Sequence, residues 1–200
     1  MKKALIGAGG FANEIKSQIG DINMLSFIDD QYYIGEKNTL PLSQFSPNEY
    51  KVVIAIGDPQ VRKKIVDKLP KETKYFTFIH PSVMVFDNVE IGEGSIICPG
   101  VIITTNCKIG KHSHLNTNTT IGHDNILGDY FTTAPGVNIS GNNKIGECVY
   151  FGTNSCTKQK ISICDNTIIG LNSGVVKNIY KPGIYIGTPS KLLNENKNIL

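Results

Sequence analysis

The pair His123-Asp124 is the feature of this sequence best suited to acid–base chemistry. An imidazole titrates near neutral pH, so His123 can accept a proton as a nucleophile attacks. A single histidine is more often an ordinary surface residue, so its value as a catalyst depends on where the fold places it.

A glycine-rich turn follows the first apolar segment of the chain. It has the pattern Gly7-x-Gly9-x-x-Ala12, and the acids Asp29 and Asp30 follow about twenty residues later. Glycines at such a turn let a phosphate approach the N-terminus of the next helix, so the pattern is typical of nucleotide binding. Only about eighty residues have this character, roughly one mononucleotide half of a dinucleotide fold. The segment is therefore too short for a complete dinucleotide fold.

Composition excludes several other classes of protein. The 200 residues are 40% hydrophobic and 18% charged, with a net charge of +3, which is a globular balance. There is no basic run with interleaved aromatic residues, so no nucleic-acid partner is expected. The apolar stretches are too short for a signal peptide or a membrane span, so we expect a cytoplasmic protein without membrane insertion. Five cysteines without a C-x-x-C pair predict free thiols.

The elements that position these residues fall into two halves. Residues 1–80 alternate strands and helices, which predicts a small Rossmann-like parallel α/β domain. We expect strands over 3–6, 25–28, 52–56 and 75–79 and helices over 11–19 and 60–69. Pro59 suits the first turn of the second helix.

From residue 85 onward the apolar residues recur with a period of six. Every sixth residue from 85 to 175 gives sixteen positions, and fourteen of them are apolar. This period fits neither a helix nor a simple strand, but it fits a hexapeptide β-helix with eighteen residues in each triangular coil. Glycines often follow the apolar position, and we expect them to relax the backbone near the corners. The register has no insertion, so no long loop is expected, and residues 81–200 are assigned to the β-helix and its tail.

The chain resembles the bacterial nucleotide-aminosugar N-acetyltransferases and the sialic-acid O-acetyltransferase-like proteins. The motifs that carry the resemblance are Gly7-Ala8-Gly9-Gly10, Phe27-Ile28-Asp29-Asp30, Ala55-Ile56-Gly57-Asp58 with Arg62, the hexads with Asn116-Thr117 and His123-Asp124, and the tail Gly187-Thr188-Pro189-Ser190-Lys191. The resemblance implies that the β-helix is left-handed and that the protein is a homotrimer. It also implies direct transfer of an acetyl group from acetyl-CoA to the amine of a nucleotide-linked sugar, without an acyl-enzyme.

The resemblance also implies residue roles. His123 is the expected base, with Asp124 orienting it. The hexad register turns His123 outward toward a neighbouring subunit and places Gly141 one coil further, ~4.8 Å away. A residue without a side chain there would let pantetheine pass, and its N–H could donate to the thioester oxygen. The residues expected to bind acetyl-CoA are Asn116, Thr132, Gly141, Gly152, Ser155, Gly170, Lys177 and Lys191.

The nucleotide-linked sugar is expected in the N-terminal domain. Its candidate contacts are Gly9, Gly10, Phe11, Asp29, Asp30, Gly57, Asp58 and Arg62, with Arg62 pairing with a phosphate. Two positions depart from many relatives, which have histidines where this chain has Phe11 and Thr132. The first departure bears on which sugar nucleotide binds, and the second on how the thioester is held.

Four functions follow, in order of preference. The first is N-acetylation of a UDP- or dTDP-linked 4-amino-4,6-dideoxy sugar for surface glycan synthesis. The second is O-acetylation of a sialic-acid hydroxyl. The third is a zinc-dependent lyase like the carbonic-anhydrase-like hexad proteins, and the fourth is a non-catalytic sugar-nucleotide-binding protein. His112, His114 and His123 lack the five-residue spacing of that zinc class, so no metal site is expected.

Overall fold

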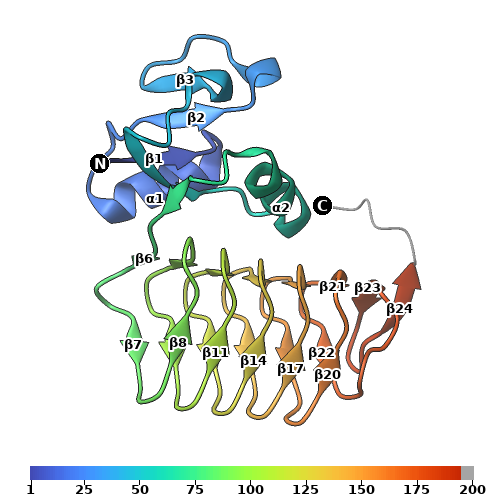
Figure 1. Cartoon of the computed structure of the whole chain (residues 1–200). Coiled ribbons are helices and arrows are strands. Elements are labelled where there is room, and N and C mark those ends of the chain that lie inside the picture. The colour runs from blue at the N-terminus through green and yellow to red at the C-terminus, as the bar shows by residue number, and fades with distance from the viewer. Residues whose placement is uncertain (195–200) are drawn as a thin grey trace.

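The computed structural model describes residues 1–194 and consists of an N-terminal α/β domain on a parallel β-helix (Figure 1). The domain has one parallel sheet in the order β3-β2-β1-β4-β5. Its strands are β1 (Lys2–Ile6), β2 (Ser26–Ile28), β3 (Thr39–Pro41), β4 (Tyr50–Ile54) and β5 (Lys74–Tyr75). Its helices are α1 (Gly10–Ile19), η1 (Asp30–Tyr32), η2 (Leu42–Gln44) and α2 (Pro59–Lys68). The central strands β1 and β4 end in buried apolar residues, as expected where helices cover a parallel sheet.

Most of the predicted elements of this half are confirmed, with two differences. The strand expected over residues 75–79 is divided, because β5 joins the domain sheet while β6 (Phe78–Ile79) pairs with β9 (Ile96–Ile97) of the β-helix. The edge strand β3 has only three residues and ends in a proline, so it carries no periodic signal of its own.

The β-helix has three faces, and we number them in the order in which the chain passes through them. The first face contains β6, β9, β12 (His114–Leu115), β15 (Thr132–Thr133), β18 (Tyr150–Phe151), β21 (Thr167–Ile169), β23 (Gly183–Ile186) and β24 (Lys191–Asn194). The second face contains β7 (Met84–Val85), β10 (Ile102–Ile103), β13 (Thr120–Ile121), β16 (Asn138–Ile139), β19 (Cys156–Thr157) and β22 (Gly174–Val175). The third face contains β8 (Glu90–Ile91), β11 (Lys108–Ile109), β14 (Ile126–Leu127), β17 (Lys144–Ile145) and β20 (Ser162–Ile163).

The predicted register of eighteen residues per coil is confirmed. From β6 to β22, successive strands of a face pair in parallel at that offset, for example Ile103 with Ile121 and then Ile139. At the end of the first face, β23 pairs with β21 at an offset of sixteen, and β24 is antiparallel to β23. The apolar hexad residues form one buried core along the prism. Thr133 is buried with them, and its hydroxyl lies 2.8 Å from that of Thr119, so its polar atom is satisfied inside the core. Val85 is an exception, because it lies in the first coil and is exposed.

The corners correct the role expected for the glycines. Every sixth residue from 88 to 172 has a φ between +53° and +74°, and most of these residues are Asn or Gly. These left-handed corner positions are not the glycines that follow the core residue. Gly110 belongs to that second set, and a Cβ there would lie 2.4 Å from the carbonyl carbon of Gly128. Such glycines are needed because adjacent coils approach closely, and not for the shape of the turn.

The α/β domain packs against the outer side of the first face. Ile96 and Cys98 of that face share a buried cluster with Leu5, Ala12 and Ile15. Neither α1 nor α2 exceeds ten residues, and no helix within residues 1–194 has the length and apolar character needed to cross a membrane.

Candidate active site

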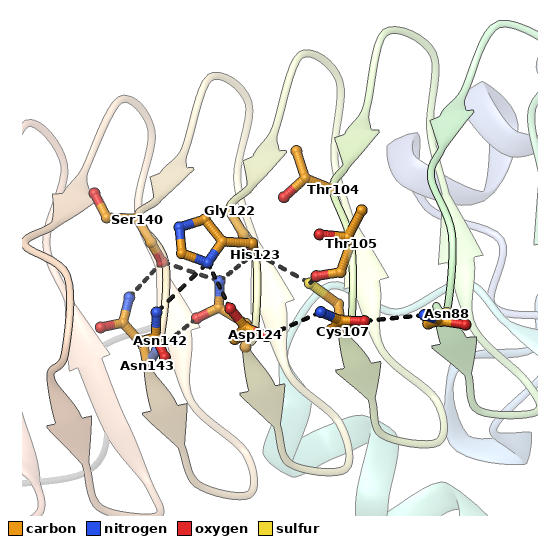
Figure 2. A network of polar contacts seen from close by, with 12 residues as sticks. Asn88, Thr104, Thr105, Cys107, Gly122, His123, Asp124, Ser140, Asn142 and Asn143 are labelled. Carbon is orange, nitrogen blue, oxygen red and sulfur yellow. Dashed lines mark hydrogen bonds and ion pairs between the residues drawn. The ribbon is translucent and has the colours of Figure 1, made fainter.

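His123 and Asp124 form a hydrogen-bonded pair at the corner between the second and third faces (Figure 2). The His123 Nδ1 lies 2.6 Å from Asp124 Oδ2, and both side chains are about half exposed in the single chain. This bond and a second one from Asn106 hold the pKa of the Asp124 carboxyl below its usual range. An ionised Asp124 only accepts hydrogen bonds, so it favours the tautomer with the proton on Nδ1. The Nε2 lone pair of His123 is then free to accept a proton.

Gly141 lies against the imidazole, as the register predicts. A Cβ built on Gly141 would be 2.7 Å from His123 Nε2 and 2.9 Å from Cε1. The φ of Gly141 is not in the left-handed region, so the backbone itself does not require glycine. The close ring explains why no side chain fits at this position.

The same corner continues into a lysine-lined depression. Lys177 occupies the same hexad position as His123, three coils further along. With Lys158 and Lys160 it borders an open cavity of about 500 Å³. Three cations near one another on this corner offer a place for phosphate groups.

A large cavity lies in the α/β domain, at the carboxyl ends of β1, β2 and β4. Its volume is about 900 Å³. Five of the expected sugar-nucleotide contacts line it: Gly9, Gly10, Phe11, Asp29 and Gly57. Tyr32, Ile34, Glu36, Lys64 and Lys68 line it too and were not foreseen. Lys64 and Lys68 are one turn apart on α2, which is a spacing that marks a shared helix face.

The N-terminus of α1 opens into this cavity. Gly9 caps the helix without a side-chain hydrogen bond, and the first turn carries no acid. A Cβ on Gly9 or Gly10 would meet no other atom within 4 Å, so the space above the free N–H groups is open. Such a terminus favours an anion. Gly7 has a structural reason to be glycine, because its φ is +116° and a Cβ would lie 2.8 Å from the Ala55 carbonyl oxygen.

Arg62 contradicts the expectation that it pairs with a phosphate. Its side chain is fully buried between the domain and the β-helix. The guanidinium donates to the carbonyl oxygens of His112 at 2.8 Å, Tyr130 at 2.9 Å and Ile56 at 2.6 Å. Burial lowers its pKa to about 9. Arg62 therefore holds the α/β domain against the β-helix. The sequence did not indicate this role, because His112 and Tyr130 lie 50 and 68 residues away along the chain.

Thr132 and Ser155 also lie away from any groove. Thr132 is on the outer side of the first face, where it is buried under the α/β domain and its hydroxyl lies 2.5 Å from Arg62 Nη2. It therefore cannot take the place of a thioester-binding histidine at this corner. Ser155 is fully buried and donates to the Gly152 carbonyl oxygen at 2.6 Å, so its hydroxyl faces the prism interior.

Two of the expected acids lie in the domain but do not line this large cavity. Asp58 caps α2 by accepting from the N–H groups of Gln60 and Val61, and it borders a smaller cavity of about 340 Å³ next to Cys148. Asp30 accepts from the Ser43 N–H at 3.0 Å, and hydrogen bonding from the Ser43 side chain, together with this bond, lowers the pKa of its carboxyl. The carboxylates of Asp30 and Asp58 therefore do not line the 900 Å³ cavity, whereas Asp29 does.

The remaining expected CoA contacts lie on other parts of the β-helix. Asn116, Gly152 and Gly170 lie at the corner between the first and second faces, and Lys191 begins β24. A Cβ on Gly152 would meet the Leu171 nitrogen at 2.7 Å, so this glycine also serves coil packing.

The other histidines near the domain junction are structural. His112 and His114 are buried under the domain, where His112 stacks on Tyr130 and His114 contacts Phe11. Burial, with help from the charge of Arg62, lowers the pKa of His112 to about 4 and the pKa of His114 as well. No group of three His, Cys, Asp or Glu side chains within residues 1–194 is arranged to hold a metal ion.

His123 and the large cavity lie on opposite sides of the prism. The α/β domain rests on the first face (Figure 1). His123 follows β13 and precedes β14, so it lies at the corner where the other two faces meet. The width of the β-helix therefore separates a ligand in that cavity from the imidazole of the same chain.

Known proteins resemble the chain over nearly its whole length. Residues 2–69 match the family model of the PglD N-terminal domain. A GDP-perosamine N-acetyltransferase of Escherichia coli O157:H7 is 30% identical over 173 residues, which cover 78% of each chain. The chain belongs to the PglD-like family of nucleotide-sugar N-acetyltransferases.

Solved structures agree with this membership. PerB of Caulobacter crescentus, in complex with CoA and GDP-perosamine, superposes with a TM-score of 0.86 at 25% identity, covering 97% of this chain and 98% of PerB. The acetyltransferase domain of PglB from Neisseria gonorrhoeae FA1090, in complex with acetyl coenzyme A, gives 0.83 at 26% identity, covering 96% and 98%. The predicted α/β domain followed by a hexapeptide β-helix and the predicted family are thus confirmed.

Proposed function

We propose that this protein transfers the acetyl group of acetyl-CoA to the amine of a nucleotide-linked 4-amino-4,6-dideoxy sugar, with His123 as the base. The observation that carries the proposal is the 2.6 Å bond between His123 Nδ1 and Asp124, which leaves Nε2 beside Gly141. Relatives in the family act on GDP- and UDP-linked amino sugars, which supports this substrate class.

The reaction needs one proton acceptor and one oxyanion donor. The amine nitrogen attacks the thioester carbonyl carbon while Nε2 of His123 takes the amine proton. The C–S bond then breaks, and the CoA thiolate leaves and takes up the proton held by Nε2 of His123, which restores the neutral imidazole. The N–H of Gly141 has no hydrogen-bond acceptor within residues 1–194 and can donate to the developing oxyanion.

Direct transfer without an acyl-enzyme fits the surroundings of His123. The nearest thiol in the polar network, Cys107, is fully buried and donates to the Gly122 carbonyl oxygen at 3.0 Å. Burial raises the pKa of this thiol. A protonated and buried thiol is a poor nucleophile, so Cys107 does not carry the acetyl group.

CoA is proposed to run along the corner from His123. Its pantetheine arm passes Gly141, and its phosphates meet Lys158, Lys160 and Lys177 beyond it. A neighbouring subunit brings its own corner with Asn116, Gly152 and Gly170 to the other side of the arm.

The nucleotide is proposed to bind in the large cavity of the α/β domain. Its phosphates lie at the N-terminus of α1, next to Gly9 and Gly10, and Asp29 accepts from the ribose or the base. Because this cavity and His123 of one chain lie on opposite sides of the prism, the amine must meet a His123 from another copy. A homotrimer satisfies this need with closed symmetry.

Release of the CoA thiol with a panel of acceptors tests the reaction. GDP-, UDP- and dTDP-linked 4-amino sugars are the expected substrates, and activity on free sialic acid alone would reject the proposal. His123→Ala should lower turnover by at least about 100-fold while CoA still binds.

Mixing two inactive variants tests the shared site. One carries His123→Ala, and the other carries Gly10→Asp, which places a carboxylate where a phosphate is expected. Co-refolded mixed trimers should regain part of the activity, because some sites combine an intact cavity with an intact imidazole. Absence of any regain would show that each chain works alone.

A further inference from the structure

A ladder of polar side chains leads along the prism to the catalytic corner (Figure 2). Asn88, Asn106 and Asp124 occupy the same left-handed position in three successive coils. Asn88 Nδ2 donates to Asn106 Oδ1 at 3.1 Å, and Asn106 Nδ2 donates to Asp124 Oδ1 at 3.2 Å. The other carboxylate oxygen of Asp124 holds His123 Nδ1.

The chemistry of Asp124 fixes the direction of this ladder. A carboxylate only accepts, so the amide of Asn106 must turn its NH₂ group toward Asp124. Its carbonyl oxygen then faces Asn88, which must in turn present its own NH₂ group. Each NH₂ group therefore points toward His123 and Asp124. Because Asn106 already donates to Oδ1 of Asp124, Oδ2 is the oxygen left for the imidazole.

We propose that Asn106 is a positioning residue for the catalytic base. By holding Oδ1 of Asp124, it keeps Oδ2 directed at His123 Nδ1 and so keeps the Nε2 lone pair of the imidazole available. The inference rests on the proposed function, in which His123 takes the amine proton. Without Asn106, the exposed carboxylate of Asp124 can rotate toward solvent, and the imidazole loses its preference for one tautomer.

A purely structural role of Asn106 makes a different prediction. Asparagine suits a left-handed corner and stacks on its neighbours, and Asn88 does so in the same column without touching Asp124. Glycine relieves the backbone at both positions, because a φ near +59° costs it little. Replacing either asparagine with glycine therefore removes the amide without straining the turn.

The first experiment compares Asn106→Gly with the matched control Asn88→Gly. Asn106→Gly should lower kcat by about 5- to 20-fold, a part of the ~100- to 10,000-fold that proton-transfer catalysis contributes, because the base stays in place but loses its preferred tautomer. KM for both substrates should stay within about twofold. Asn88→Gly should keep kcat within about twofold, and the two variants should have similar melting temperatures. An equal loss of kcat in both variants, or a loss that follows melting temperature, would overturn the proposal.

The second experiment uses charge at the same position. Asn106→Asp keeps the shape of the side chain, and aspartate tolerates this backbone conformation, as Asp124 itself shows. At low pH a shared proton lets the new carboxyl donate to Asp124, whereas at high pH two carboxylates repel each other. Among residues 1–194, the other titratable groups at Asp124 are the imidazole of His123 and the buried thiol of Cys107. The ratio of variant to parent kcat should therefore fall as pH rises from about 5 to about 8, and a constant ratio would contradict the proposal.

A third measurement needs no substrate. Nitrogen-15 shifts of His123 in the full-length protein should show the Nδ1–H tautomer in the parent and in Asn88→Gly, and a mixture of tautomers in Asn106→Gly. Unchanged tautomers would refute the positioning role. If the protein lacks acetyl transfer but the tautomers shift as expected, the proposed function fails while the contact to Asp124 stands.

Discussion

Replacing Gly141 with alanine should disable the base while leaving the fold intact. The new Cβ would lie 2.7 Å from Nε2 of His123, 2.9 Å from Cε1 and 3.0 Å from Cδ2. Ordinary carbon contacts begin at ~3.5 Å, so the ring must move by about 0.8 Å. The ring is half exposed and can swing outward, but doing so breaks its 2.6 Å bond to Asp124.

The size of the effect follows from that displacement. A shift of ~1 Å in a catalytic group costs on the order of 100-fold in rate, so kcat should fall by about 10- to 100-fold. The backbone at Gly141 is not in the left-handed region, so the melting temperature should change little. Steady-state release of the CoA thiol gives kcat, and differential scanning calorimetry gives the melting temperature.

A double-mutant cycle isolates the contact between the methyl group and the ring. In a His123→Ala background there is no imidazole to displace, so Gly141→Ala should lower the residual turnover by a smaller factor than it lowers kcat in the parent. The reasoning is refuted if Gly141→Ala retains kcat within about twofold, or if it lowers the rate equally in both backgrounds.

Three further changes test other parts of the structure. Asp124→Asn should keep the corner, since asparagine already occupies seven of the fifteen left-handed corner positions. It should lower kcat roughly 10-fold or more, because an amide NH₂ can face Nδ1 and favour the wrong tautomer. Circular dichroism checks the fold, and the pH–rate profile checks the tautomer. Arg62→Met should lower the free energy of unfolding by about 3 kcal/mol or more, because the buried carbonyl oxygens of His112 and Tyr130 lose their donor. Urea unfolding measures this change. Weakened nucleotide binding at unchanged stability would contradict the structural role of Arg62. Burial lowers the pKa of His114, so below pH ~6.5 the unfolded chain binds a proton at this residue that the folded chain does not. The stability that neutral His114 contributes is therefore present above pH ~6.5 and is lost as the pH falls. His114→Leu should recover roughly 2 kcal/mol of unfolding free energy at pH 5 and change it little at pH 7.5, as measured by urea unfolding.

The sequence was sufficient for the β-helix because its signal repeats. Each hexad fills one side of the prism, so an error in a single residue does not disturb the period, and the offset of eighteen also placed Gly141 beside His123. The corners were misjudged because a left-handed backbone position leaves no apolar signature. Asn106 was nonetheless accessible from the register, since it lies eighteen residues before Asp124.

The errors of the site prediction are concentrated at the junction of the two halves. Arg62 and Thr132 both occupy positions where relatives suggest ligand contacts, yet here they bond to each other in a buried interface. The spacing of residues along the chain indicates the periodicity within one helix or strand. It does not tell which helix or strand will pack on which other. The prediction that Ser155 contacts CoA was wrong for a related reason. A serine at a corner gives the same sequence signal whether its hydroxyl points into the prism or out of it.

The division of the site between the two parts of the chain has a consequence for catalysis. The α/β domain is fastened to the first face by Arg62, whose guanidinium reaches carbonyl oxygens of two adjacent coils. His123, the proposed base, lies across the prism and is held by contacts that run along the corner and do not involve the domain. Each chain can therefore hold its nucleotide cavity rigidly relative to its own β-helix, but it cannot bring the two sites together by closing. Under the proposed function, the approach of the amine to the thioester depends on how copies of the chain pack. A substitution that alters the packing of the second or third face should therefore lower turnover even when every residue of both sites is intact.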